Sequence, residues 1–271
     1  MPVDGSAAPV IGALPSAPRA RTGVPALAAT SHAAPVVAGP AHRWGFGAFL
    51  LAEAVLLLSA VFLAAILDPG PPGGVVPVST ALIGTIVPTM LAAGVALLAT
   101  VLRGNGPVID LRLTVRRADL VVGLKLGGIG IVLTVVAAFI WTKAVGAKDA
   151  SSAINGLFGS GKMSVTSAVI LFVYVCLLGP ICEELIFRGL LWGAIKRQNW
   201  GRWAAFVLST AIFAVSHLEP SRTILLLVIA VPIGLARLFT DRLPASIVAH
   251  QVNNFLPALV TLLVALGIMS Q

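Results

Sequence analysis

The chain has 271 residues, of which 58% are hydrophobic and 10% are charged, and its formal net charge is +8. A soluble domain of this length needs more polar material to cover its surface, so the composition excludes an ordinary soluble protein. The positive charge does not indicate nucleic-acid binding, because the arginines and lysines lie mainly in one tail and in short loops without interleaved aromatic residues.

Residues 1–42 differ from the rest of the chain. They are rich in Ala and Pro and show no apolar periodicity, which is typical of a disordered tail. An early basic region followed by a compact apolar stretch is missing, so we do not interpret this segment as a signal peptide. Its arginines, Arg19, Arg21 and Arg43, favour a cytoplasmic location for the tail.

Apolar stretches dominate the remainder, and several reach the roughly 20 residues that a helix needs to cross a bilayer. The sequence therefore predicts an all-α fold, a polytopic bundle of transmembrane helices. The predicted spans are 44–67, 78–102, 120–145, 164–196, 200–217, 223–240 and 244–269. Pro257 lies inside the last stretch, and a break there would raise the count from seven to eight.

The basic residues of the loops predict the orientation. They gather after the second, fourth and sixth spans, on the same side as the tail. Because cytoplasmic loops carry an excess of Lys and Arg, we expect the N-terminus inside and, with seven spans, the C-terminus outside. No strong internal repeat is apparent, which argues against a transporter built from inverted repeats.

The fourth predicted span contains GPICEELIFRGLLWG, residues 179–193, with three charged side chains among apolar ones. Charges inside a bilayer are costly and indicate function. Glu184 and Arg188 are four residues apart, so they share a helix face and can form an ion pair. Glu183 points about 100° away and needs a partner from another helix. We expect Pro180 to bend the helix and to leave backbone carbonyls without a donor.

Two histidines fall in later spans. His217 ends FAVSH, one turn after Phe213, and His250 begins HQVNN, one turn before Asn254 on the same face. Counted from the basic loops at 1.5 Å per residue, Glu183 and His217 both lie roughly 20 Å deep, whereas His250 lies roughly 12 Å deep. The first two are therefore expected to meet, and His250 joins them only if its helix tilts or its loop is longer.

These three segments resemble the Glu-Glu-x-x-x-Arg, Phe-x-x-x-His and His-x-x-x-Asn motifs of the CPBP intramembrane proteases. That family includes type II CAAX prenyl endopeptidases, Abi proteins and bacteriocin-processing or immunity proteins. The resemblance covers about residues 165–258. The tail (1–42) and the three N-terminal spans with their loops (43–163) carry no family signal, and residues 164–271 are the expected catalytic helical core. We expect an integral protein of the bacterial plasma membrane.

The resemblance also implies an intramembrane endopeptidase and assigns roles to residues of this chain. A glutamate would activate a water molecule with help from a histidine, and a second histidine and an asparagine would hold the oxyanion. The implied catalytic residues are Glu183, His217, His250 and Asn254, and the implied supporting residues are Glu184, Arg188 and Phe213.

The residues leave the question of a metal open. Glu183, His217 and His250 could instead hold Zn²⁺ with water as the fourth ligand. A zinc enzyme would need a separate general base, and the nearest carboxylate, Glu184, is expected to pair with Arg188. We therefore favour water activated by Glu183 without an obligatory metal, with Zn²⁺ as the alternative cofactor.

The motifs of other intramembrane proteases are missing, and two non-protease functions stay open. A site-2 type protease is excluded because HExxH is absent, and no Ser–His pair typical of a rhomboid is evident. A non-catalytic scaffold or immunity protein of the same family stays open, as does a proton-coupled transporter with Glu and His as a relay. The expected partners are membrane lipid and a membrane-associated peptide or protein substrate, without nucleic acid. Glu53 in the first span is interpreted as a polar contact near the interface.

Overall fold

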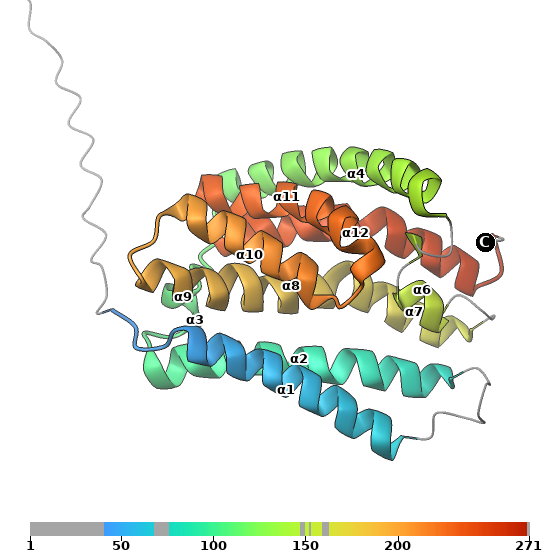
Figure 1. The fold of residues 1–271 in the computed structure, drawn as a ribbon, viewed down its shortest axis with the longest axis horizontal. Coiled ribbons are helices and arrows are strands. Elements are labelled where there is room, and N and C mark those ends of the chain that lie inside the picture. Colours follow the sequence, from blue (N-terminus) through green and yellow to red (C-terminus); the bar gives the residue numbers. More distant parts are fainter. Residues whose placement is uncertain (1–40, 68–75, 147–149, 152, 159–162, 270–271) are drawn as a thin grey trace, which may run out of the picture. The chain divides into compact units, whose positions relative to one another are not determined.

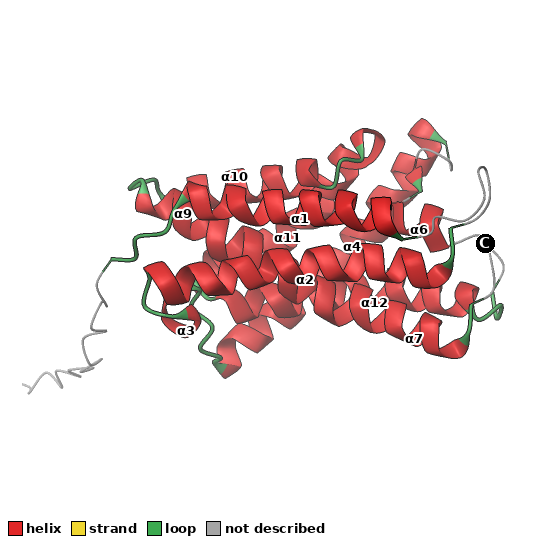
Figure 2. Cartoon of the chain, turned by 90° about the horizontal axis from the view of Figure 1, so that it is seen from below, coloured by secondary structure: helices red, strands yellow, loops and turns green. Residues whose placement is uncertain are grey.

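The computed structural model describes residues 41–67, 76–146, 150–151, 153–158 and 163–269, so the predicted tail lies almost wholly outside the described residues. The regular structure in these ranges is entirely helical, which confirms the predicted all-α class (Figures 1 and 2).

Seven helical segments follow the predicted spans to within a few residues. One of them, Val165–Arg197, is built from five consecutive pieces and is called the fourth helix below. The segments are α1 (Phe46–Ile66), α2 (Val78–Arg103), α4 (Arg117–Val145), the fourth helix with α7 (Val165–Val173), η1 (Tyr174–Leu178), α8 (Gly179–Glu184), η2 (Leu185–Leu191) and α9 (Trp192–Arg197), then α10 (Arg202–Ser216), α11 (Thr223–Thr240) and α12 (Leu243–Ala265). Short helical pieces that the sequence did not predict are α3 (Pro107–Asp110), α6 (Ala153–Phe158) and η3 (Pro220–Arg222).

Among the described residues, 6 helices are long and apolar enough to cross a membrane, which indicates an integral membrane protein. The predicted fifth span is not among them. Its helix, α10, has 15 residues, about 22 Å at the rise of an α-helix, whereas the hydrocarbon core is about 30 Å thick. In Figures 1 and 2 the turn after α10 stops short of the ends of α4 and α12. The alternative of an eighth span is wrong, because α12 continues through Pro257.

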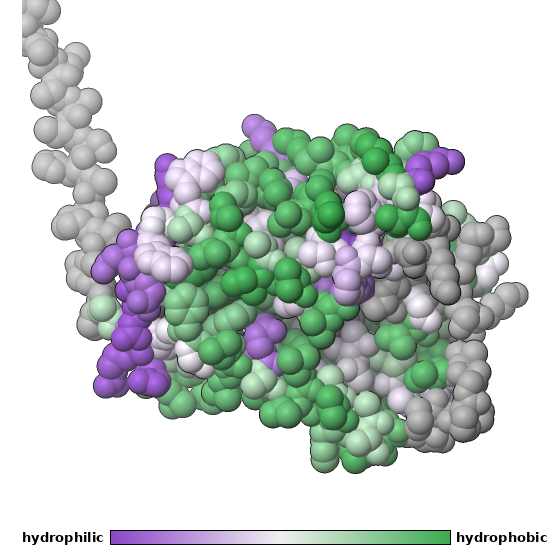
Figure 3. Space-filling model, viewed as in Figure 1, coloured by the Kyte–Doolittle hydropathy of each residue, from purple (hydrophilic) through white to green (hydrophobic). Residues whose placement is uncertain are grey.

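The surface of the helices suits a lipid environment. Large apolar side chains such as Leu58, Phe62 and Phe139 are more than 60% exposed, at 69%, 61% and 65%. Figure 3 shows hydrophobic residues across the middle of one face, with hydrophilic residues gathered at the left end. Such exposure would promote aggregation in water, whereas apolar side chains can face lipid acyl chains without cost.

The loops predicted to share one side meet at one end of the bundle, here called the basic end. Backbone and side-chain contacts join the segment before α1 to the ends of α2 and α9, and join the loop after α2 to the loop after α11. These contacts are Arg43 N to Arg103 O, Arg197 Nη1 to Trp44 O, Arg112 to Asp241, and Arg242 Nη1 to Thr114 O.

The helices α4 and α12 pack closely because α4 presents glycines to α12. A Cβ on Gly123 would lie 2.7 Å from the carbonyl oxygen of Ala245, and one on Gly127 would lie 2.6 Å from Cβ of Val252. Small residues let helix backbones approach where no hydrophobic effect drives helices together in lipid. The glycines of α4 therefore set the position of α12.

Gly127→Leu is expected to separate α4 from α12 and to lower the free energy of unfolding by about 1–3 kcal/mol, the usual cost of overpacking. Gly128→Leu is the matched control, because a Cβ there meets nothing within 4 Å. Thermal unfolding of the purified variants in detergent measures the difference. Equal melting temperatures for the two variants would contradict this account of the helix contact.

Candidate active site

The fourth helix is irregular around its glutamates, and Pro180 explains one consequence. Gly179 N donates to Tyr174 O, the i→i−5 pattern of a π-helix. Continued by one residue, that pattern would pair Val175 O with the nitrogen of Pro180, which carries no hydrogen. Asn254 Nδ2 donates to Val175 O instead, at 3.2 Å. The carbonyl expected to lose its donor therefore anchors a side chain of α12.

The predicted ion pair of the fourth helix is present and fully buried. Arg188 Nη1 lies 3.0 Å from Glu184 Oε1, and both side chains are 0% exposed. The Arg188 guanidinium carbon lies 4.4 Å from the centre of the Phe213 ring, a cation–π contact. The pair needs no further charged partner to be neutral.

His250 links the two adjacent glutamates. Its Nδ1 lies 3.0 Å from Glu184 Oε1, the oxygen that also accepts from Arg188. An ionised carboxylate oxygen can only accept hydrogen bonds. The hydrogen therefore lies on Nδ1, which donates it to Glu184 Oε1. His250 Nε2 lies 3.6 Å from Glu183 Oε2. The partner that Glu183 was expected to find on another helix is therefore His250, and its bond to Glu184 was not predicted.

The predicted shallow depth of His250 is wrong, because α12 begins inside the bundle. Leu243, the first residue of α12, is 0% exposed. Its Cδ2 lies 3.7 Å from the position of a Cβ on Gly189. His250 follows Leu243 by seven residues, and Glu183 precedes Gly189 by six, so the two lie about 10 Å and 9 Å along their helices from a common level.

His217 is held by the helix that it ends. Its Nδ1 lies 2.8 Å from the carbonyl oxygen of Phe213. A carbonyl only accepts, so Nδ1 carries the hydrogen and Nε2 keeps its lone pair. The half-buried His217 ring also packs at 4.7 Å, centre to centre, against the ring of Phe213.

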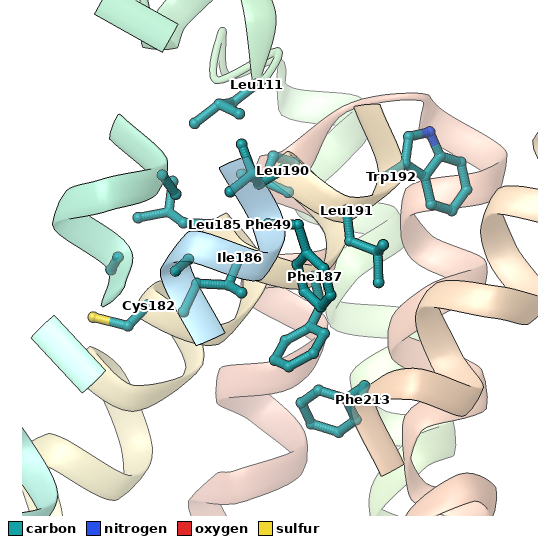
Figure 4. Close-up of a cluster of buried hydrophobic side chains, with 14 of the residues drawn as sticks. Phe49, Leu111, Cys182, Leu185, Ile186, Phe187, Leu190, Leu191, Trp192 and Phe213 are labelled. Atoms are coloured by element: carbon teal, nitrogen blue, oxygen red, sulfur yellow. The ribbon is translucent and has the colours of Figure 1, made fainter. Parts of the chain in front are cut away.

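Phe213 lies between the two histidines. Its ring centre is 5.7 Å from that of His250 and 5.2 Å from that of Phe187. Figure 4 shows Phe49, Phe187 and Phe213 as neighbours, so the aromatic contacts continue from α10 through the fourth helix to α1. Phe213, which was expected to support the site, thus separates His217 from His250.

The two glutamates differ sharply in access. The side chain of Glu183 is 28% exposed, whereas that of Glu184 is 0% exposed. Among the hydrogen bonds and ion pairs of the described residues, none joins Glu183 to His217, whereas Glu183 does face His250.

The alternative zinc set is not formed. In the part of the chain that the structure describes, no group of three or more His, Cys, Asp or Glu residues could hold a metal ion. The Nδ1 atoms of His217 and His250 hydrogen-bond Phe213 O and Glu184, which leaves Nε2 as the nitrogen of each ring that a metal could use. The described positions of Glu183, His217 and His250 do not bring three such ligands together.

Sequence reasoning missed or misplaced other residues near the site. Arg237, which falls near the end of the sixth predicted span, lies buried in the last turn of α11 and donates from Nε to Arg188 O at 3.0 Å. Gln251 Nε2 donates to Leu177 O at 3.4 Å, which ties α12 to the fourth helix beside the Asn254 contact. Glu53 on α1 has a buried Oε1 without a hydrogen-bond partner among the described residues. Only Gln251 carried a signal, as the neighbour of His250 in HQVNN.

Comparison with known families agrees with the motifs. Residues 165–256 match the model of the Rce1-like family, described as type II CAAX prenyl endopeptidase Rce1-like. These residues form an Rce1-like domain. The Rce1-like domain runs from the start of the fourth helix into α12 and contains Glu183, His217, His250 and Asn254. The curated proteins and the solved structures gave no significant match to the chain. The protein is thus a membrane protein that carries a domain of a CAAX protease family.

Glu184→Gln should destabilise the fold, because it leaves Arg188 as a buried charge without its counterion. Removing one partner of such a pair costs about 3–5 kcal/mol. Glu183→Gln is the matched control, since the carboxylate of Glu183 is partly exposed and lies outside the Glu184–Arg188 pair. Thermal unfolding in detergent should show a large loss for Glu184→Gln alone; equal losses in both variants would contradict the different roles given to the two glutamates.

Proposed function

We propose that the protein is an intramembrane endopeptidase in which Glu183 activates a water molecule to hydrolyse a peptide bond. The proposal rests on the different environments of the two adjacent glutamates. Glu184 and Arg188 already neutralise each other's charge in the interior. Glu183 lies outside that pair, is partly exposed and faces His250, so a purely structural role does not explain it.

The first step is proton transfer from water to Glu183. The Nε2 lone pair of His217 accepts a hydrogen bond from the same water and orients it. The oxygen of the water attacks the carbonyl carbon of the scissile bond. The proton held on Glu183 then passes to the leaving nitrogen, the C–N bond breaks, and the products are a carboxylic acid and an amine.

The negative charge on the carbonyl oxygen needs donors in the intermediate. In this proposal His250 is an imidazolium, whose Nδ1 donates to Glu184 and whose Nε2, on the side of Glu183, donates to the oxyanion. Asn254 uses one amide hydrogen on Val175 O and keeps the second for the oxyanion. Donors fixed in advance stabilise such a charge without reorganisation during the reaction.

The finer setting belongs to the same proposal. We place the basic end in the cytoplasm of a bacterial plasma membrane, with the N-terminus inside, because Lys and Arg concentrate on that side of membrane proteins. The substrate class is a membrane-associated peptide or protein, and a prenylated CAAX peptide is one candidate that the family description suggests.

Glu183→Gln should abolish proteolysis while leaving the fold intact, because Gln keeps the size of the side chain but cannot take the proton. A lost general base lowers the rate by at least about 100-fold. Membranes from cells that express either form are compared by mass spectrometry of newly formed peptide N-termini, and purified protein is tested on a prenylated CAAX peptide.

Glu53→Gln is the control for that experiment, since it neutralises another carboxylate of a membrane helix outside the Rce1-like domain. Activity that survives in Glu183→Gln would exclude the proposed base. Identical N-termini in cells with the wild-type protein and in cells without the protein would favour a non-catalytic membrane protein instead.

Chelation tests the metal separately. We expect substoichiometric zinc in the purified protein and unchanged proteolysis after treatment with a chelator, because the ligand geometry gives no three-residue metal site among the described residues. Stoichiometric zinc, with activity lost on chelation and restored by Zn²⁺, would overturn this expectation.

A further inference from the structure

A groove of about 690 Å³ lies at the basic end, between the start of α1 and the end of α2. It is remote from the residues assigned to catalysis, none of which lines it. Its walls are mostly apolar, and three arginines lie at its rim. The apolar wall includes Leu51 from α1 and Leu98 and Leu102 from α2.

The three arginines come from separate parts of the chain. Arg43 precedes α1, Arg103 ends α2 and Arg197 ends α9. Hydrogen bonds hold these segments together: the backbone nitrogen of Arg43 donates to Arg103 O at 2.6 Å, and the Arg197 side chain donates from Nη1 to Trp44 O at 2.9 Å. The side chains of Arg43 and Arg103 are exposed, and the described residues that line the groove include no carboxylate.

Trp44 gives the groove a fixed wall. It is 1% exposed, and its Nε1 donates to Asp110 Oδ2 at 2.9 Å. A Cβ on Gly193 would lie 2.2 Å from the Trp44 ring, so the indole packs directly on the backbone of α9. Asp110 also accepts from the backbone nitrogen of Asn105, at 3.0 Å. Among the described residues, no ion pair joins Asp110 to Arg43, Arg103 or Arg197.

The apolar part of the groove is open to lipid. Leu51, Leu98 and Leu102 are 55%, 53% and 64% exposed. Arg103 is the last residue of α2, a candidate membrane span, so the rim lies where the bilayer meets water. A ligand that fits both the leucines and the arginines of the groove has an acyl chain with an anionic headgroup at its end.

We propose that this groove binds an anionic phospholipid, with its phosphate between Arg43 and Arg103 and an acyl chain along α1 and α2. Basic pockets between membrane helices bind acidic lipid headgroups by direct charge attraction. A zwitterionic lipid leaves the three positive charges uncompensated, and a free phosphate ester leaves the apolar walls unused. This binding site is independent of the proposed peptidase activity.

The headgroup is tested with the full chain purified in detergent. Dioleoyl phosphatidylglycerol should raise the melting temperature by several degrees, because a ligand that binds the folded state stabilises it. Dioleoyl phosphatidylcholine and soluble glycerol 3-phosphate should not. The double variant Arg43→Gln/Arg103→Gln should need about 30-fold more phosphatidylglycerol for the same shift, at about fivefold per arginine.

Matched controls separate this groove from general surface charge. Arg117→Gln/Arg202→Gln removes two exposed arginines that do not line the groove, so the phosphatidylglycerol shift should persist. Both tested arginine side chains can be changed without removing the backbone bond between their segments. Equal shifts with phosphatidylcholine, or the full effect of phosphatidylglycerol in Arg43→Gln/Arg103→Gln, would overturn the proposal.

The acyl chain is tested by filling the groove. Gly47 lines it, and a Cβ there meets nothing within 4 Å, so Gly47→Trp places an indole in the groove without a clash at the backbone. Native mass spectrometry should show retained phosphatidylglycerol in wild type and in the control Gly84→Trp, whose Cβ is equally unobstructed. It should show loss of the lipid in Gly47→Trp; retention there would overturn the proposed position of the chain.

Discussion

One carboxylate oxygen, Glu184 Oε1, holds the candidate site together. It accepts from Arg188 on its own helix and from His250 on α12, both at 3.0 Å. Leaving water costs a buried charge several kcal/mol, so neither partner can be lost without leaving an uncompensated group. The shared oxygen therefore fixes the distance between the fourth helix and α12 and orients His250 toward Glu183.

The geometry that follows from this oxygen depends on irregular backbone. The π-helical turns on both sides of Glu184 shift the register of the fourth helix, and the lost N–H of Pro180 gives Asn254 its acceptor at Val175. Irregular backbone at membrane depth persists only where other protein groups satisfy it. The side chain of Asn254, one turn after His250 on α12, satisfies the carbonyl of Val175.

The local features of this arrangement could be predicted, and the tertiary ones could not. Spacing alone predicted the Glu184–Arg188 pair, because residues four apart meet on any helix. The bond from His250 to Glu184 and the buried position of Arg237 depend on which helices become neighbours. The depth of His250 was misjudged because the start of α12 is set by Leu243 packing beneath the basic end, which a count along the sequence cannot reveal.

The helices outside the Rce1-like domain supply what the domain lacks. In lipid, apolar side chains gain nothing by leaving acyl chains for one another, so small residues and interhelical hydrogen bonds must select the packing. The glycines of α4 meet α12, and the hydroxyl of Tyr174 donates to Thr89 Oγ1 of α2 at 3.0 Å. Phe49 of α1 packs edge-on against Phe187. The fourth helix, with Glu183 and Glu184, is thus held by α1 and α2, and α12, with His250, is held by α4. That support keeps Glu183 and His250 at their observed separation.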